Sequence, residues 1–331
     1  MTALHQQIRR TIRRHGLCPP GSRLVIALSG GSDSVAMTLL LQDLARTAGF
    51  SLVSLAHFNH RLRPTAERDE QFCRTFAEQA HLPVAVEAVD VQAYAAAERL
   101  SIEDAARRAR YAFLYRVARD LDADRIAVGH TRDDQAETLL LKLIRGAGLT
   151  GLGGIFPRRG SVIRPLLDVS RAELRTYLTG RGQIWVDDES NDSISNPRNR
   201  IRHRVMPDLE LSYSGAARGL ARAAAAGRDD GQWLDDLAGR RYVDVVLETG
   251  EGLELDADAL AAEPMPVRRR ILLQALRNVA GSREVGLEHV EAALEVLGNE
   301  FPGADLPGCR LELRRGKLVL TKRGSRASEV P

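Results

Sequence analysis

A short loop rich in glycine and serine, with one carboxylate, follows the first apolar stretch of the chain. The stretch Leu24–Leu28 precedes it, and an apolar helical pattern begins at Val35. This order predicts a strand, a tight loop and a helix, whose first N–H groups have no helical partner and favour an anion. A Walker-type loop is excluded because no lysine follows the glycines. We therefore expect a different phosphate-binding loop, the alternative being a plain glycine turn. Its residues are Ser29, Gly30, Gly31, Ser32, Asp33 and Ser34.

A second group of polar residues follows the predicted strand 125–128. His130 stands just after this strand, and Asp133 and Asp134 open a predicted helix that runs to Ile144. Acidic residues are common helix openers, so capping alone could explain the two aspartates. Because parallel strands end at the same edge of a sheet, however, Asp33 and Asp134 should face one crevice. Two carboxylates there are a suitable site for Mg²⁺.

Two histidines and two arginines gather after the predicted strand 52–58. His57 and His60 lack a nearby acidic or cysteine residue that would complete a metal site. Contact with phosphate or adenine is therefore the favoured interpretation for His57, and a solvated basic loop is the alternative.

An arginine-rich helix is predicted from Asn196-Pro197, with Asn196 as the cap and Pro207 as its end. Its arginines are denser than solubility requires, which indicates contact with a nucleic-acid backbone, although a solvated charged face is the alternative. The arginines proposed for this contact are Arg198, Arg200 and Arg202.

The predicted elements alternate between strands and amphipathic helices, which is typical of a doubly wound α/β domain with a mainly parallel sheet. Thr65 is expected to cap a helix to Gln79, and Ser101 opens another that carries Arg107 and Arg110. A glycine-rich segment follows Gly146. From residue 213 the pattern becomes helical, with a strand near 243–247 and a final β-hairpin around Gly316. We predict domains at 1–212 and 213–322 and a disordered tail at 323–331.

Composition limits the classes of partner. The chain has 331 residues and a formal net charge of only +3, so a nucleic acid would have to meet a local basic patch. Three scattered cysteines argue against a disulfide framework or a zinc site. Neither a signal peptide nor a membrane span is expected, and we predict a cytoplasmic protein without membrane contact.

The loop Ser29–Ser34 resembles the S-G-G-x-D-S loop of the PP-loop ATP pyrophosphatases, which have an adenine nucleotide α-hydrolase-like fold. Further motifs narrow the resemblance to the tRNA(Ile)-lysidine synthetases. They are residues 57–63, Glu103 to Tyr111, Gly129 to Thr138, and Glu189-Ser190-Asn191 followed by residues 198–202.

This resemblance implies a ligase that uses ATP and Mg²⁺. ATP would adenylate the C2 oxygen of the wobble cytidine in the isoleucine tRNA with a CAU anticodon, and free L-lysine would then displace AMP. The implied roles are pyrophosphate binding by the loop, Mg²⁺ binding by Asp33 and Asp134, and charge neutralisation at the α-phosphate by Arg107 and His130. Asp134 is a candidate base for the lysine amine. The second domain would read tRNA identity, and a homodimer is one expected oligomeric state.

Two rival classes stay open at this point. A tRNA-thiolating PP-loop enzyme would share the ATP half but usually carries sulfur on cysteines at defined spacing, which Cys18, Cys73 and Cys309 do not provide. A noncatalytic RNA-binding module would explain the arginine helix but not Asp33, Asp134 or the glycine loop.

Overall fold

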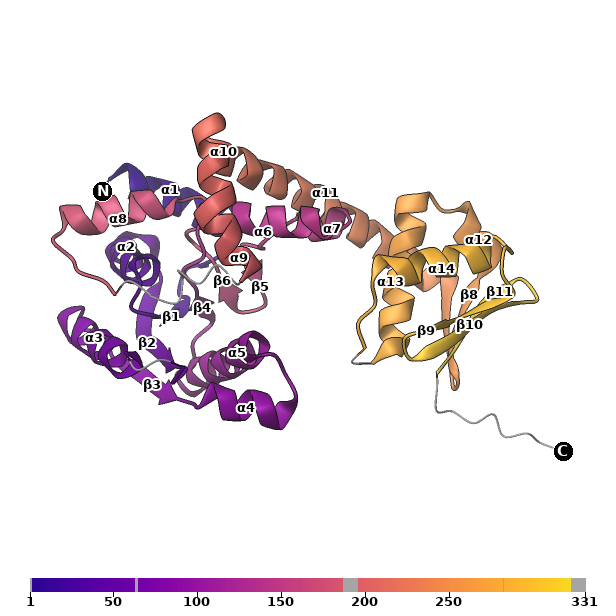
Figure 1. Ribbon diagram of the computed structural model, residues 1–331, viewed down its shortest axis with the longest axis horizontal. Helices are drawn as coiled ribbons and strands as arrows, with labels where there is room; N and C mark the ends of the chain where they lie inside the picture. The colour runs from indigo at the N-terminus through magenta and orange to yellow at the C-terminus, as the bar shows by residue number, and fades with distance from the viewer. Residues whose placement is uncertain (1, 63–64, 187–195, 282, 323–331) are drawn as a thin grey trace. The chain divides into compact units, whose positions relative to one another are not determined.

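The computed structural model describes residues 2–62, 65–186, 196–281 and 283–322 (Figure 1). Contacts divide the chain into two compact units. The first contains residues 1–147 and 152–225, and the second contains residues 148–151 and everything from Ala226 onward. The division falls within the long helix α11 (Ala216–Val245), which the sequence assigned wholly to the second domain.

The first unit is built on a six-stranded sheet with the order β3-β2-β1-β4-β6-β5. All neighbouring strands are parallel except the short edge strand β5, which runs antiparallel to β6. The predicted mainly parallel sheet is therefore confirmed. The strands are β1 (Arg23–Ala27), β2 (Ser51–Asn59), β3 (Val84–Ala88), β4 (Arg125–Ala127), β5 (Arg158–Arg159) and β6 (Val162–Ile163).

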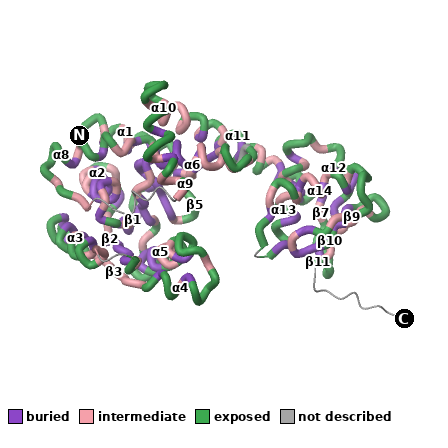
Figure 2. The backbone as a smooth tube through the Cα atoms, viewed as in Figure 1, coloured by how far each residue is buried: buried purple, intermediate pink, exposed green. Residues whose placement is uncertain are grey.

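Helices cover both faces of this sheet because its central strands are apolar on both sides. In β1, Leu24 and Ile26 pack into one hydrophobic core, whereas Val25 packs into the other. Figure 2 shows the resulting buried centre between exposed outer helix faces. The helices of the unit before residue 181 are α1 (Ala3–Arg14), α2 (Ser32–Ala48), α3 (Ala66–Gln79), α4 (Val91–Glu98), α5 (Ile102–Asp120), α6 (Arg132–Ile144) and α8 (Arg171–Gly180).

The arginine-rich segment forms a helix that does not end where the sequence predicted. Asn196 caps α9 (Pro197–Arg200) by accepting a hydrogen bond from the Arg198 N–H, as expected. A π-helical turn (Ile201–Val205) then leads directly into α10 (Met206–Ser212). The prediction that Pro207 ends the helix was wrong, because the wider π turn accommodates a residue that has no N–H to donate.

The second unit packs helices against a five-stranded antiparallel sheet with the order β7-β8-β11-β10-β9. The predicted hairpin is confirmed. Arg315 and Gly316 form its two-residue turn, both with positive φ. The predicted strand at 243–247 begins only at Val246. The elements are α7 (Leu149–Leu152), β7 (Val246–Thr249), β8 (Gly252–Asp256), α12 (Ala257–Ala262), α13 (Met265–Ala280), α14 (Leu287–Leu297), β9 (Gly303–Leu306), β10 (Cys309–Arg314) and β11 (Lys317–Lys322).

Some local predictions differ from the structure or fall outside it. Thr65 precedes α3, but its hydroxyl accepts no capping hydrogen bond, because its backbone is already helical with ψ near −2°. The motif Glu189-Ser190-Asn191 and the tail 323–331 lie outside the described residues. Within the part of the chain that the structure describes, no helix is both long enough and apolar enough to cross a membrane.

Candidate functional site

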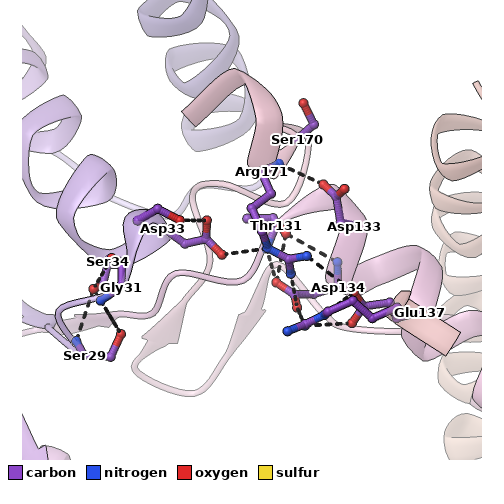
Figure 3. A network of polar contacts seen from close by, with 12 residues as sticks. Ser29, Gly31, Asp33, Ser34, Thr131, Asp133, Asp134, Glu137, Ser170 and Arg171 are labelled. Atoms are coloured by element: carbon purple, nitrogen blue, oxygen red, sulfur yellow. Dashed lines mark hydrogen bonds and ion pairs between the residues drawn. The ribbon is translucent and has the colours of Figure 1, made fainter. Parts of the chain in front are cut away.

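The loop Ser29–Ser34 follows β1, ends in the first turn of α2, and is held by its own hydrogen bonds (Figure 3). The Ser34 hydroxyl accepts a hydrogen bond from the Ser29 N–H at 3.1 Å and donates one to the Gly31 carbonyl at 3.0 Å. Gly30 has φ +89°, a conformation that favours glycine. A Cβ at Gly30 would lie 3.3 Å from the Cys73 sulfur, so the backbone packs tightly here. The loop is therefore shaped before any ligand binds.

His57 lies at the carboxyl end of β2 and is buried. Its Nδ1 is 2.9 Å from the Leu28 carbonyl, which can only accept, so the ring proton sits on Nδ1. The other nitrogen, Nε2, is a buried acceptor without a partner among the described residues. Burial lowers the pKa of His57, which favours this neutral form.

The loop after β4 closely approaches the first loop. A Cβ at Gly129 would lie 3.4 Å from the backbone of Asp33 and Ser34. Two residues later, Thr131 and Asp134 form a reciprocal capping box at the start of α6. One carboxylate oxygen of Asp134, Oδ2, accepts hydrogen bonds from the Thr131 N–H at 2.8 Å and from its hydroxyl at 2.9 Å. Capping therefore orients Asp134 and leaves Oδ1 free for other partners.

Arg171 joins the two carboxylates that the sequence placed at one crevice. Its Nε donates to Asp33 Oδ2 at 3.2 Å, and its Nη2 donates to Asp134 Oδ1 at 3.0 Å. Figure 3 shows its side chain reaching between Asp33 and Asp134 from the start of α8. The backbone N–H of Arg171 also donates to Asp133 at 2.9 Å, so this neighbour of Asp134 holds the start of α8, which Ser170 caps. One guanidinium thus bridges two strand ends.

Two arginines of the arginine-rich segment complete this group of charges. Arg198 donates to Asp134 at 3.0 Å and to Glu137 at 3.0 Å, and Arg202 donates to the same two carboxylates at 3.1 and 2.8 Å. Glu137 lies three residues after Asp134 on the same face of α6 and is 2% exposed. We call Asp33, Asp134, Glu137, Arg171, Arg198 and Arg202 the carboxylate–arginine cluster.

The two aspartates of the cluster have opposite pKa shifts. Burial raises the pKa of Asp134, but Arg171 and Arg198 outweigh this and bring it down to about 2. Burial also raises the pKa of Asp33, and there the nearby charge of Asp134 adds to the increase while Arg171 opposes it. Asp134 is therefore firmly ionised, and Asp33 is the carboxylate of the pair that binds a proton more readily.

His130 is held by an arginine that the sequence analysis did not single out. The Arg164 Nε donates to His130 Nδ1 at 3.2 Å, and its Nη1 donates to the Phe156 carbonyl at 2.8 Å. Because guanidinium can only donate, His130 Nδ1 must be the acceptor and Nε2 carries the proton. Desolvation, together with nearby Arg164, lowers the pKa of the partly buried His130 to about 3. His130 is thus a neutral side chain that can donate from Nε2.

The structure places the other predicted charged residues differently from one another. Asp33, Asp134, Arg198 and Arg202 lie together in the cluster. Arg107 instead lies over the ring of Tyr111, with its guanidinium carbon 5.0 Å from the ring centre. Arg200 is exposed and has no carboxylate partner among the described residues.

Sequence reasoning missed Glu137, Arg164 and Arg171. The spacing of Glu137 from Asp134 could have indicated it, because residues three apart share a helix face. Arg164 and Arg171 carry no such local signal.

The donor set fits a divalent cation together with phosphates. Within the described residues no group of three metal-ligating side chains is preassembled. Asp33 and Asp134 nevertheless hold one cationic group, the Arg171 guanidinium, between them. Mg²⁺ commonly binds one or two carboxylates and takes its other ligands from phosphates and water. The unpartnered acceptor of His57 likewise fits a donor such as the adenine amino group.

Comparison with known proteins agrees with this arrangement. Residues 2–209 match the PP-loop domain family. The chain is 41% identical to the tRNA(Ile)-lysidine synthase of Geobacter sulfurreducens over 92% of its length, covering 65% of that protein. It is 38% identical to the synthase of Symbiobacterium thermophilum over 95% of its length, covering 68% of that protein, and 39% identical to that of Thermus thermophilus over 87%, covering 55%. The chain thus spans roughly two thirds of the length of the first of these relatives.

A solved structure with the same fold is a U34-tRNA thiolase, NcsA, from Methanococcus maripaludis. Its TM-score is 0.58 at 18% identity, with coverage of 68% of this chain and 78% of the other. At this identity the likeness supports the α/β fold alone. The assignment to a family rests instead on the match to the PP-loop domain and on the identity to the lysidine synthases. The chain belongs to the tRNA(Ile)-lysidine synthase family of PP-loop proteins.

Proposed function

We propose that this chain is a tRNA(Ile)-lysidine synthase. It would adenylate the C2 oxygen of the wobble cytidine in the CAU-anticodon isoleucine tRNA with ATP, release pyrophosphate, and join the ε-amine of free L-lysine to C2 as AMP leaves. The observation that carries this proposal is the bridge from Asp33 through Arg171 to Asp134, which joins the phosphate-binding loop to the second strand end.

The loop and the two histidines would bind and orient ATP. The N–H groups of Gly30 to Ser34 open α2, where the helix dipole favours the leaving pyrophosphate. The free Nε2 of His57 would accept a hydrogen bond from the adenine amino group. The Nε2–H of His130 would donate to the α-phosphate without adding a positive charge, and Arg107 would add that charge if its side chain leaves Tyr111.

Asp33 and Asp134 would hold Mg²⁺ by their carboxylates, and the ion would neutralise charge on the phosphates. The Arg171 guanidinium bridges the same two carboxylates. It would have to move away when Mg²⁺ binds, or remain bound to them beside the ion. A carboxylate with a pKa of about 2 is a weak base, so Asp134 suits charge stabilisation. The raised pKa of Asp33 belongs to the site without the ion, and bound Mg²⁺ would lower it, so Asp33 would also act as an ionised ligand.

The arginine-rich segment would divide its work between the site and the tRNA. Arg198 and Arg202 donate to carboxylates, which favours a role in holding Asp134 and Glu137. Arg200 is exposed and remains available to a tRNA phosphate. Reading of tRNA identity by the second unit, assembly as a homodimer and a cytoplasmic location stay predictions.

Thiolation is the second candidate function, and the cysteines disfavour it. Cys18, Cys73 and Cys309 are all buried thiols. Burial raises the pKa of Cys18 and of Cys73 to about 12, so these thiols are poor sulfur carriers at neutral pH.

The deciding experiment measures incorporation of labelled lysine into isoleucine tRNA with ATP and Mg²⁺, beside a parallel reaction supplied with a labelled sulfur donor. We expect lysine incorporation that requires ATP and releases AMP and pyrophosphate. Methionine tRNA with the same anticodon is the control substrate and should not be modified. Sulfur incorporation without lysine incorporation would overturn the proposal.

A further inference from the structure

A basic pocket lies beside α5 in the first unit, against the strands β5 and β6. Its volume is about 540 Å³, within the range of about 300–1,000 Å³ that is common for ligand sites. We propose that this pocket binds an unpaired nucleotide of an RNA substrate. We call it the α5 pocket, and its lining includes Arg107, Arg108, Tyr111, Tyr115, Arg159 and Arg164.

The charge of the α5 pocket favours an anion. Its lining contains four arginines and one acidic residue, Asp104, whose carboxylate accepts a hydrogen bond from Ser101 at 2.6 Å. Arg159 has no carboxylate partner among the described residues, and Arg108 meets Glu98 only at 3.7 Å. This excess of positive charge disfavours free lysine as the occupant, because lysine also has a net positive charge.

The aromatic side chains favour a base beside the phosphate. Tyr115 is 48% exposed, and its ring centre is 6.2 Å from that of Tyr111. The guanidinium carbons of Arg107 and Arg110 lie 5.0 and 5.4 Å from the Tyr111 ring centre, so Tyr111 is already engaged. Tyr115 is therefore the free stacking surface. Exposed aromatic rings among arginines are the usual means of binding single-stranded nucleic acid, in which a base can be unstacked at low cost.

The lining of the α5 pocket includes no residue of the loop Ser29–Ser34. Arg164 lies between the two regions, because it lines the pocket and also donates to His130. If ATP binds at the loop Ser29–Ser34 and Arg107 turns towards its α-phosphate, the other arginines of the α5 pocket stay available for the second anionic substrate. This inference rests on the proposed function for the identity of that RNA, an anticodon loop, but binding can be measured without ATP or lysine.

The test measures affinity for a labelled RNA hairpin with the anticodon-loop sequence at several salt concentrations. Arg159→Ala should weaken binding and lower the salt slope by about one, since one phosphate contact is lost. Tyr115→Ala should weaken binding by about 10-fold, and Tyr115→Phe should leave it near wild type because the ring remains. Arg119→Ala is the matched control. Arg119 is an exposed arginine on the same helix that does not line the pocket.

The inference is overturned if Arg159→Ala and Tyr115→Ala bind the hairpin as Arg119→Ala does. It is also overturned if free cytidine monophosphate binds as tightly as the hairpin, since the site would then take a mononucleotide. A blunt RNA duplex of equal length should compete poorly. If these variants lose RNA binding although the wild type makes no lysidine, the proposed function fails and the pocket assignment stands.

Discussion

The loop Ser29–Ser34 and the carboxylate–arginine cluster lie at the same edge of one sheet, yet they are stabilised differently. The loop is held within six residues by the hydroxyl of Ser34 and by the backbone conformation of Gly30. The cluster joins residues as far apart as Asp33 and Arg171, which are 138 positions apart in the sequence. The loop can thus keep its shape alone, whereas the cluster forms only when α6, α8 and the arginine-rich segment are all packed.

The largest expected effect is a loss of adenylation rate when a carboxylate of the cluster is removed. Asp134→Asn removes the charge that three guanidiniums share and should lower the rate of adenylation by at least about 100-fold, the usual cost of losing one preorganised electrostatic contact. Asp33→Asn should have a similar effect. Pyrophosphate release in the presence of tRNA measures both.

Asp133→Asn is the control, because the Asp133 side chain accepts only a backbone N–H, which an asparagine oxygen can also accept, and is not part of the cluster. A rate for Asp134→Asn close to that of Asp133→Asn would contradict the proposed role of the cluster.

The next largest expected effect is on the free energy of unfolding, which a substitution in the cluster should lower more than a substitution in the loop. Glu137→Gln removes a buried charge from three arginines, Arg171, Arg198 and Arg202, which are 21%, 34% and 19% exposed. Solvent screening reduces the cost to about 2 kcal/mol. Ser34→Ala removes hydrogen bonds of the loop and should cost about 1 kcal/mol. Urea unfolding of a Trp233→Phe background reports on the first unit through Trp185, which packs against its core. Equal losses would mean that the loop depends on tertiary packing as much as the cluster does.

A third prediction concerns the stability of the folded chain at acidic pH. The folded state lowers the pKa of His130 to about 3, so below the ordinary value of 6.5 the unfolded chain binds a proton that the folded chain does not. The free energy of unfolding should therefore fall as the pH drops from about 6.5 towards 3. Because part of the ring is still accessible to water, we expect about 1 kcal/mol between pH 7 and pH 5. His130→Gln should remove that part of the pH dependence. If the free energy of unfolding of this variant depends on pH as the wild type does, the prediction is wrong.

The smallest expected effect separates the arginines of one segment. Arg200→Ala should lower the salt slope of tRNA binding by about one, and Arg202→Ala should leave the slope unchanged because its guanidinium is engaged with Glu137. ATP affinity serves as the second readout and should respond to Arg202→Ala alone. A lowered salt slope for Arg202→Ala would instead indicate that Arg202 contacts a tRNA phosphate, as the sequence predicted.

The contrast between local and long-range contacts explains what could be predicted from the sequence. The sheet, the loop and the meeting of Asp33 with Asp134 follow from strand order, glycine placement and the common edge of parallel strands. The bridging role of Arg171 could not be predicted, because an arginine after a capping serine is ordinary on any helix. The spacing of Arg198 and Arg202 indicates that they share a helix face, but that this face packs on Glu137 of α6 could not be predicted.

The π turn at Ile201–Val205 also fixes the rotational phase between the two ends of its helix. Upstream, Arg198 is aligned with α6, while downstream Met206 and Leu209 pack with Ala136 and Leu220. Each residue advances an α-helix by about 100°. Deleting one residue from the turn would restore a regular helix but rotate α10 by about that angle, which would turn Met206 away from its apolar neighbours. The extra residue therefore allows a single helix to satisfy a polar site and an apolar core whose directions a regular α-helix would not match.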